Sequence, residues 1–115
     1  MFDKFVMRRD CLNNFDPTRN RDIGKVKISA ANTRLHELVK TSIAYDILKE
    51  GHEFITEGIL CKGKGRIDVV DVSICEAFEV VCSEKEESLL KKKNKYPIDF
   101  KIIRATKKYL IDKLD

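Results

Sequence analysis

The stretch GRIDVVDVSICEAFEVVCSE, residues 65–84, decides the fold because it places two acids inside apolar runs that otherwise predict buried β-strands. These acids are Asp68 and Glu79. A buried carboxylate without a partner costs on the order of several kcal/mol, so two of them in neighbouring strands indicate a shared partner. If the strands pair as a hairpin, both carboxylates can lie at one end of the sheet, within reach of one divalent cation.

The segments on either side of this stretch predict an α/β fold. Before it, a wide apolar arc predicts a helix over residues 32–50, with Asn32 as its N-cap and Gly51 as its stop. After it, Ser83 and Glu86 form a capping-box pattern at the start of a further helix. The predicted order is helix, three strands, helix, strand and helix, over residues 32–50, 52–60, 66–73, 76–82, 84–96, 98–104 and 106–114.

A chain of 115 residues is long enough to bury one hydrophobic core, so a single domain over residues 1–115 is predicted. Hydrophobic residues make up 43% and charged residues 37%, which indicates a packed interior under a charged surface rather than disorder. In the first 31 residues the pattern predicts a short helix, a turn at Asp16-Pro17 and a brief strand from Lys25 to Ile28. The expected parts are a basic N-terminal extension, a core and a C-terminal helix, over residues 1–31, 32–104 and 105–115.

Composition excludes several functional classes. The four cysteines form no C-x-x-C pair and lie far in sequence from the two histidines, so structural zinc is not expected. Neither His36 nor His52 has the spacing of a nucleophilic triad, and both are expected at a surface or interface. With no signal peptide and no apolar run near about 18 residues, the chain is expected to be intracellular, in the cytoplasm, with no membrane partner. The net charge of +4 permits a polyanionic partner without requiring one.

The order of elements and the acids together resemble the PD-(D/E)XK nuclease superfamily, which includes archaeal Holliday-junction resolvases and restriction-endonuclease-like proteins. The resemblance covers residues 32–104 and rests on Glu37 in NTRLHELVK, Asp68 in GRIDVV and Glu79 in AFEVV. It implies a restriction-endonuclease-like αβββαβ core, in which helices flank a mixed four-stranded sheet. It further implies that Asp68 and Glu79 hold Mg²⁺ or Mn²⁺, with Glu37 as a supporting acid, for hydrolysis of phosphodiester bonds in DNA.

The chain departs from this family where a lysine is expected two positions after the glutamate, because Val81 stands there. Residues i and i+2 of a strand share a face, so an amine at this position would point at the attacking water, and valine has none to offer. The nearest substitutes are the lysines of the following helix, of which Lys92 and Lys95 are the candidate catalytic residues. Val81 also favours an alternative: a nuclease-like protein without turnover that binds nucleic acid or serves as an assembly module.

Basic side chains near the acids are candidates for contact with DNA phosphates, and the DNA could be branched or single-stranded. They are also consistent with a solvated surface, and the two acids with a purely structural role in a small adaptor protein. Relatives of the resolvase type act as dimers, so the resemblance makes a homodimer one expected assembly. The candidate nucleic-acid-binding residues are Lys62, Lys64, Arg66 and Lys91.

Overall fold

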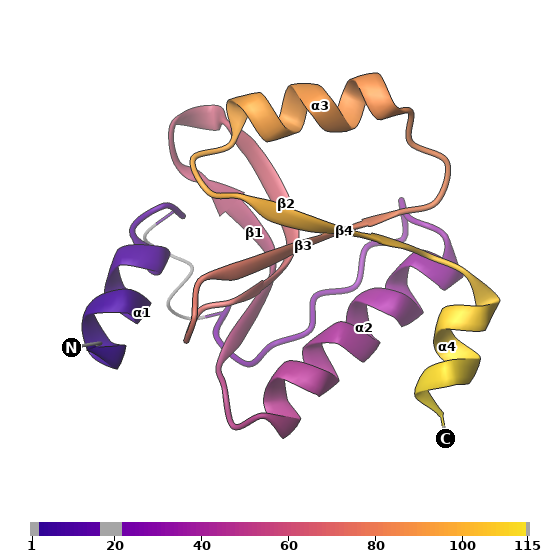
Figure 1. Cartoon of the computed structure of the whole chain (residues 1–115), viewed down its shortest axis with the longest axis horizontal. Coiled ribbons are helices and arrows are strands. Elements are labelled where there is room, and N and C mark those ends of the chain that lie inside the picture. The colour runs from indigo at the N-terminus through magenta and orange to yellow at the C-terminus, as the bar shows by residue number, and fades with distance from the viewer. Residues whose placement is uncertain (1–2, 17–21, 115) are drawn as a thin grey trace.

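The computed structural model describes residues 3–16 and 22–114, and within them one mixed four-stranded sheet is combined with four α-helices, which makes the fold α/β. The strands lie in the order β1-β2-β3-β4, with β1, β2 and β3 antiparallel and β4 parallel to β3. In Figure 1, α3 lies over one face of the sheet, and α2 and α4 lie beneath the other. The elements are α1 Lys4–Leu12, α2 Arg34–Lys49, β1 Phe54–Leu60, β2 Gly65–Asp71, β3 Glu76–Val81, α3 Glu86–Lys95, β4 Phe100–Arg104 and α4 Lys107–Lys113.

Helix α2 begins one residue later than predicted. Its N-cap is Thr33, whose hydroxyl accepts the backbone N–H of His36, so the expectation of Asn32 as the cap was wrong. The helix ends as predicted before Gly51, which has a φ of 78° in the left-handed region that glycine adopts without steric cost. One side of α2 is buried against the sheet through Val39, Ile43, Ala44 and Ile47.

The hydrophobic core has two clusters. One brings Cys11 and Phe15 of the N-terminal segment together with strand residues, so α1 is joined to the sheet by core packing. The other lies between the sheet, α2 and α4. The first cluster contains Cys11, Phe15, Ile55, Leu60, Ile67, Val70, Val72, Ala77 and Phe100, and the second contains Val39, Ile43, Ala44, Ile47, Phe54, Val69, Val80 and Ala105.

The sheet divides partway along β2 and β3, and we call this place the fork. Strands β2 and β3 pair from Asp71↔Glu76 to Val69↔Phe78. Beyond that point β2 continues beside β1 and β3 continues beside β4. Asp68 and Glu79 are the next residues of the two strands, so they face each other where the strands separate. The prediction that they lie opposite one another across the β2–β3 hairpin is confirmed, but they lie midway along β2 rather than at one end of the sheet.

Two local predictions were wrong. No strand forms from Lys25 to Ile28; instead this segment is held against β1, where Thr56 Oγ1 accepts the Lys27 N–H and donates to the Lys25 carbonyl. The capping box at Ser83 does not form, because α3 begins later, at Glu86, after an N-cap without a side-chain hydrogen bond. The predicted turn at Asp16-Pro17 extends outside the described residues. Among those described, no helix has the length and apolar character needed to cross a membrane.

Candidate active site

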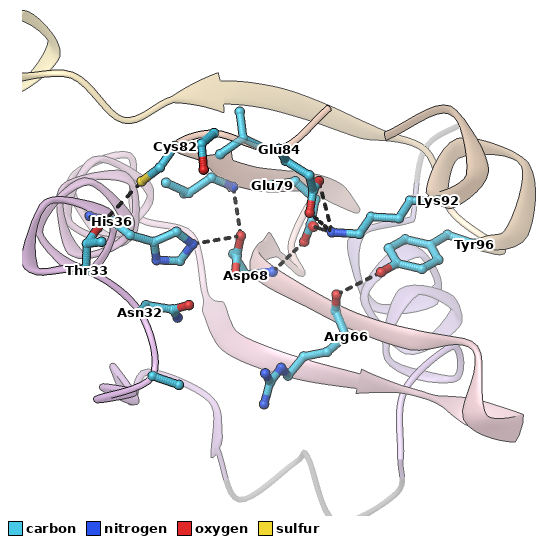
Figure 2. Close-up of a pocket in the computed structure, with 14 residues that line it drawn as sticks. Asn32, Thr33, His36, Arg66, Asp68, Glu79, Cys82, Glu84, Lys92 and Tyr96 are labelled. Carbon is cyan, nitrogen blue, oxygen red and sulfur yellow. Dashed lines mark hydrogen bonds and ion pairs between the residues drawn. The ribbon is translucent and has the colours of Figure 1, made fainter. Parts of the chain in front are cut away.

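A pocket of about 570 Å³ opens at the fork, between the start of α2 and helix α3. Figure 2 shows that its walls come from three parts of the chain: the α2 N-terminus, the separated ends of β2 and β3, and the inner side of α3. Polar and charged side chains dominate its lining. The residues that carry the argument below are His36, Arg66, Asp68, Glu79, Lys92 and Tyr96.

Asp68 and Glu79 take over hydrogen bonds that a continuous β-ladder would otherwise make. The Asp68 backbone N–H donates to Glu79 Oε1 over 3.0 Å, and the Val80 N–H donates to Asp68 Oδ2 over 2.8 Å. Each carboxylate therefore satisfies a backbone amide of the facing strand at the point where the strands part. This arrangement fixes both acids and keeps the fork open (Figure 2).

The two acids have altered proton affinities. Burial, followed by the negative charge of Asp68, raises the pKa of Glu79 to about 7. Burial also raises the pKa of Asp68, although the hydrogen bond from Val80 and the nearby His36 oppose this rise. Their side chains are only 15% and 5% exposed, for Asp68 and Glu79 respectively. Two carboxyls that are largely shielded from solvent and repel each other's charge form a site that favours a proton or a cation between them.

Lys92 reaches into the pocket from α3. Its Nζ lies 3.2 Å from Glu79 Oε2 and 2.8 Å from Glu84 Oε1, and its side chain is 30% exposed. Burial lowers the pKa of Lys92, but the hydrogen bond to Glu84 and the charge of Glu79 outweigh it, so the pKa is raised. The amine is therefore cationic at neutral pH. Of the two candidate lysines, this is the one that the structure brings to the acids.

His36 lies on the opposite side of the pocket, at the start of α2. Its Nε2 is 3.5 Å from Asp68 Oδ2, and its Nδ1 is 2.8 Å from Glu37 Oε2. Glu37, the expected supporting acid, does not line the pocket. It instead accepts from Lys40 Nζ at 2.7 Å and from the Ser29 N–H at 2.6 Å. Although burial opposes it, these hydrogen bonds lower the pKa of Glu37 to about 2, so the carboxylate is ionised at neutral pH.

The remaining predicted residues divide between the pocket and the surface around it. Val81 lines the pocket at 3% exposure, so the expected lysine position presents an apolar wall. Arg66 lines the pocket, with its Nε 3.2 Å from Glu57 Oε2. Among the lining residues there is no other member of the predicted nucleic-acid set and no second lysine. The predicted residues outside the pocket are Lys62, Lys64, Lys91 and Lys95.

Sequence reasoning missed three residues of this pocket. His36 was expected at a surface or interface, yet it is buried against Asp68. Glu84, in the extended segment before α3, accepts a hydrogen bond from Lys92. The Tyr96 hydroxyl donates a hydrogen bond to the Arg66 carbonyl over 3.2 Å. One signal was available for Glu84, because it follows β3 at the same end of the sheet as Glu79. No pattern in the sequence singled out His36 or Tyr96.

The acid pair fits a hard divalent cation such as Mg²⁺, because both available ligands are carboxylate oxygens. A cation between them would also relieve the repulsion that contributes to the raised pKa of Glu79. Within the described residues, no group of three or more histidine, cysteine, aspartate and glutamate side chains is arranged to hold a metal ion. Mg²⁺ is commonly held by one or two carboxylates with water in its other positions, and Asp68 and Glu79 could provide that number.

The chain was compared with models of protein families, with curated proteins and with solved structures, and none of them matches it. No relative therefore supplies a function. The geometry of the pocket and the chemistry of its residues are what bear on the function.

Proposed function

We propose that this protein is a metal-dependent nuclease of restriction-endonuclease-like fold that hydrolyses phosphodiester bonds in DNA. The observation that carries the proposal is the position of half-buried Asp68 and buried Glu79, on adjacent strands, at a fork that opens into a polar pocket. Catalysis of phosphodiester hydrolysis depends on placing positive charge where negative charge develops. A buried acid pair beside a lysine is suited to assembling that charge.

Asp68 and Glu79 would hold Mg²⁺ or Mn²⁺ through their carboxylate oxygens. When bound, the cation would lower the pKa of a water molecule and neutralise charge on the phosphate. Lys92 already lies beside Glu79 and supplies a fixed positive charge at this edge of the pocket. Its role would be to orient the scissile phosphate or the attacking water. The family resemblance implies this role for a lysine at the position where Val81 stands.

His36 and Glu37 would have a positioning role. The His36 ring lies between two carboxylates, with Nδ1 2.8 Å from Glu37 Oε2 and Nε2 3.5 Å from Asp68 Oδ2. The imidazole thereby limits the movement of the Asp68 carboxylate. Glu37 remains a supporting acid in this proposal, although it acts through His36 rather than by contact with the reacting groups.

DNA is the proposed substrate because basic side chains surround the pocket. Arg66 lies at its wall with 59% of its side chain exposed, and Lys62 and Lys64 are in the β1–β2 turn beside it. Lys91 lies on α3, the helix that also contributes Lys92. Positive charge on both sides of an acidic centre favours a phosphate chain laid across the opening.

Two observations favour a second function, a nuclease-like protein that binds nucleic acid or serves in an assembly without cleaving. Val81 is buried and apolar at the position where an amine would act. In addition, Lys92 is held by Glu84 as well as Glu79, so its charge is partly compensated before any substrate arrives. Binding without turnover would leave the same pocket and basic surface.

Cleavage assays on supercoiled, single-stranded and four-way-junction DNA, with and without Mg²⁺ or Mn²⁺, test the two functions. For the nuclease, Asp68→Asn and Glu79→Gln should each lower the cleavage rate on the order of 10²–10³-fold, since each removes a charge next to the reacting centre. Glu87→Gln, an exposed acid on α3, is the matched control and should leave the rate unchanged.

The outcomes separate the candidates. Cleavage that survives both Asp68→Asn and Glu79→Gln contradicts the site. DNA binding that weakens with salt, without cleavage under any metal condition, supports the second function. Absence of both binding and cleavage contradicts the nuclease and the nucleic-acid-binding role, and leaves only the assembly role.

A further inference from the structure

Two cysteines from distant parts of the chain meet on the side of the sheet covered by α1. Cys11, in α1, is 1% exposed and belongs to a core cluster, and Cys75, in the turn between β2 and β3, packs against the same cluster. Both line one surface hollow of about 530 Å³ between α1 and that turn. The side chains of the two residues thus come together between the α1 helix and the turn. The pair lies apart from the fork, whose pocket neither residue lines.

The two sulfurs differ in their protonation chemistry. The hydrogen bond with Cys75 raises the pKa of Cys11, and burial raises it further. The same hydrogen bond lowers the pKa of Cys75, against the opposing effects of burial and of the Asp71 charge. Cys75 therefore has the greater thiolate character of the two. The thiolate is the form of cysteine that reacts with oxidants.

Cys75 lies in a turn that is partly open to solvent and outside the strand pairing. Cys75 is half-buried, and its neighbour Ile74 is 41% exposed, so this part of the turn faces solvent. The paired register of β2 and β3 ends at Asp71↔Glu76, which leaves Cys75 outside it. Movement of Cys75 toward Cys11 therefore breaks none of the β2–β3 strand pairings. Its φ of 52°, in the left-handed region, already marks a conformation that is uncommon for a residue other than glycine.

We propose that Cys11 and Cys75 form a reversible redox site, in which a hydroperoxide converts the two thiols into a disulfide. The Cys75 thiolate attacks the peroxide, the O–O bond breaks, and the sulfur becomes a sulfenic acid as the leaving oxygen takes a proton to form water or an alcohol. The Cys11 sulfur then attacks the Cys75 sulfur and the S–O bond of the sulfenic acid breaks. The departing oxygen takes up the Cys11 proton and leaves as water. The peroxide is reduced by two electrons, and the two thiols are oxidised.

This reaction would tie α1 covalently to the β2–β3 turn. A cross-link that closes a long loop stabilises the folded state by restricting the unfolded chain. The other two cysteines lie elsewhere and serve as internal controls. Cys61 Sγ lies 3.7 Å from the Asn13 carbonyl, and Cys82 Sγ lies 3.5 Å from Thr33 Oγ1.

The test treats the reduced full chain with hydrogen peroxide, blocks the remaining thiols with N-ethylmaleimide, and maps the linked peptides by mass spectrometry after digestion without reduction. One peptide pair, joining Cys11 to Cys75, is expected, with two thiols lost per chain. Oxidation should also raise the Tm by roughly 10 °C, and dithiothreitol should reverse the rise. The variant Cys61→Ser/Cys82→Ser should give the same cross-link and the same shift.

Cys75→Ser should abolish both the cross-link and the Tm rise, and it should leave Cys11 available for alkylation after unfolding. Cys75 is half-buried, so this change is milder than replacing Cys11. Wild-type mapping decides the question even if a variant fails to fold. A cross-link between any other pair, linkage only between chains, or four thiols unchanged by peroxide overturns the proposal.

Discussion

Two groups, each of a lysine and its neighbouring carboxylates, lie on either side of His36. They differ in where the lysine lies relative to the acids. In the first, which we call the buried network, Lys40 lies between Glu37 and Glu57. In the second, the acid pair at the fork, Asp68 and Glu79 face each other and Lys92 touches only one of them. The first group has its cation at the centre, and the second has its cation at one side.

This difference appears in exposure and in proton affinity. Lys40 is fully buried, with its amine 2.7 Å from Glu37 and 3.1 Å from Glu57, and the pKa of Glu37 is lowered to about 2. Lys92 is 30% exposed, and the pKa of Glu79 is raised to about 7. The buried network is thus electrostatically satisfied within the fold. The charges of the acid pair are compensated only in part within the fold, which is the condition expected of a ligand-binding site.

The largest expected effect comes from breaking the buried network. Lys40→Met leaves Glu37 and Glu57 buried without their shared cation, so the free energy of unfolding should fall by about 3–5 kcal/mol. Urea denaturation followed by circular dichroism measures the change. Lys49→Met, on the exposed end of the same helix, is the control and should change stability by no more than about 0.5 kcal/mol. Equal losses of unfolding free energy in the two variants would contradict a special contribution of buried Lys40 to stability.

Neutralising Glu79 in the acid pair should raise the free energy of unfolding, whereas breaking the buried network lowers it. Glu79 has a higher pKa when folded than its ordinary value of 4.5, so the folded state binds more protons between pH 4.5 and about 7. The free energy of unfolding should therefore fall as pH rises through this window. Glu79→Gln keeps an oxygen to accept the Asp68 N–H but does not ionise. In metal-free buffer at pH 8 it should be more stable than the wild type by roughly 1–3 kcal/mol.

Denaturation of both proteins from pH 4.5 to pH 8 measures this difference. The advantage of Glu79→Gln should be smallest at pH 4.5 and grow with rising pH. Mg²⁺ should then raise the Tm of the wild type at pH 8 and leave that of Glu79→Gln almost unchanged, since a ligand stabilises only the form that binds it. A constant offset at every pH, or an equal response to Mg²⁺, would contradict the shared-cation interpretation.

A smaller effect is expected at Lys92, the cation on one side of the pair. If the protein cleaves DNA, Lys92→Met should lower the rate about tenfold through loss of a positive charge near the phosphate, without weakening Mg²⁺ binding. Cleavage kinetics and a Mg²⁺ titration measure the two quantities separately. Lys49→Met, at the exposed end of α2 and outside the pocket, is the control. A similar loss for both variants would assign the effect to general charge rather than to contact with Glu79.

The smallest effect is expected in the β1–β2 turn. If Lys62 and Lys64 contact phosphates, replacing each with alanine should reduce the slope of log affinity against log salt by about one unit. Fluorescence anisotropy with labelled DNA at several salt concentrations gives the slope. Lys49→Ala, on the far end of α2, should leave it unchanged. Unaltered slopes for Lys62→Ala and Lys64→Ala would remove this turn from the DNA interface.

Several elements were predictable because their signals are local. Alternating apolar residues placed all four strands to within about two residues, and Gly51 ended α2 where its backbone freedom was needed. The capping box at Ser83 failed although its residues match the pattern. There, Glu84 accepts a hydrogen bond from Lys92 instead of joining a helical first turn, so a contact across space replaced the local one.

The candidate site was predictable only in part. The spacing of Asp68 and Glu79 was sufficient to place them together, because hairpin pairing follows from a short turn. The choice between Lys92 and Lys95 depended on how α3 packs on the sheet. The role of Glu37 depended on the rotation of α2, which turns Glu37 toward Lys40 and its neighbour His36 toward Asp68.

By itself, the sequence determined the order of strands and helices and the pairing of two acids across a hairpin, because these depend on periodicity and on neighbours in the chain. The tertiary structure alone decided which charges meet. It closed Lys40 inside one group of acids and left Asp68 and Glu79 at an open fork. The physical reason is that burial and charge contact are set by the packing of helices against the sheet, and residues far apart in the sequence make those contacts.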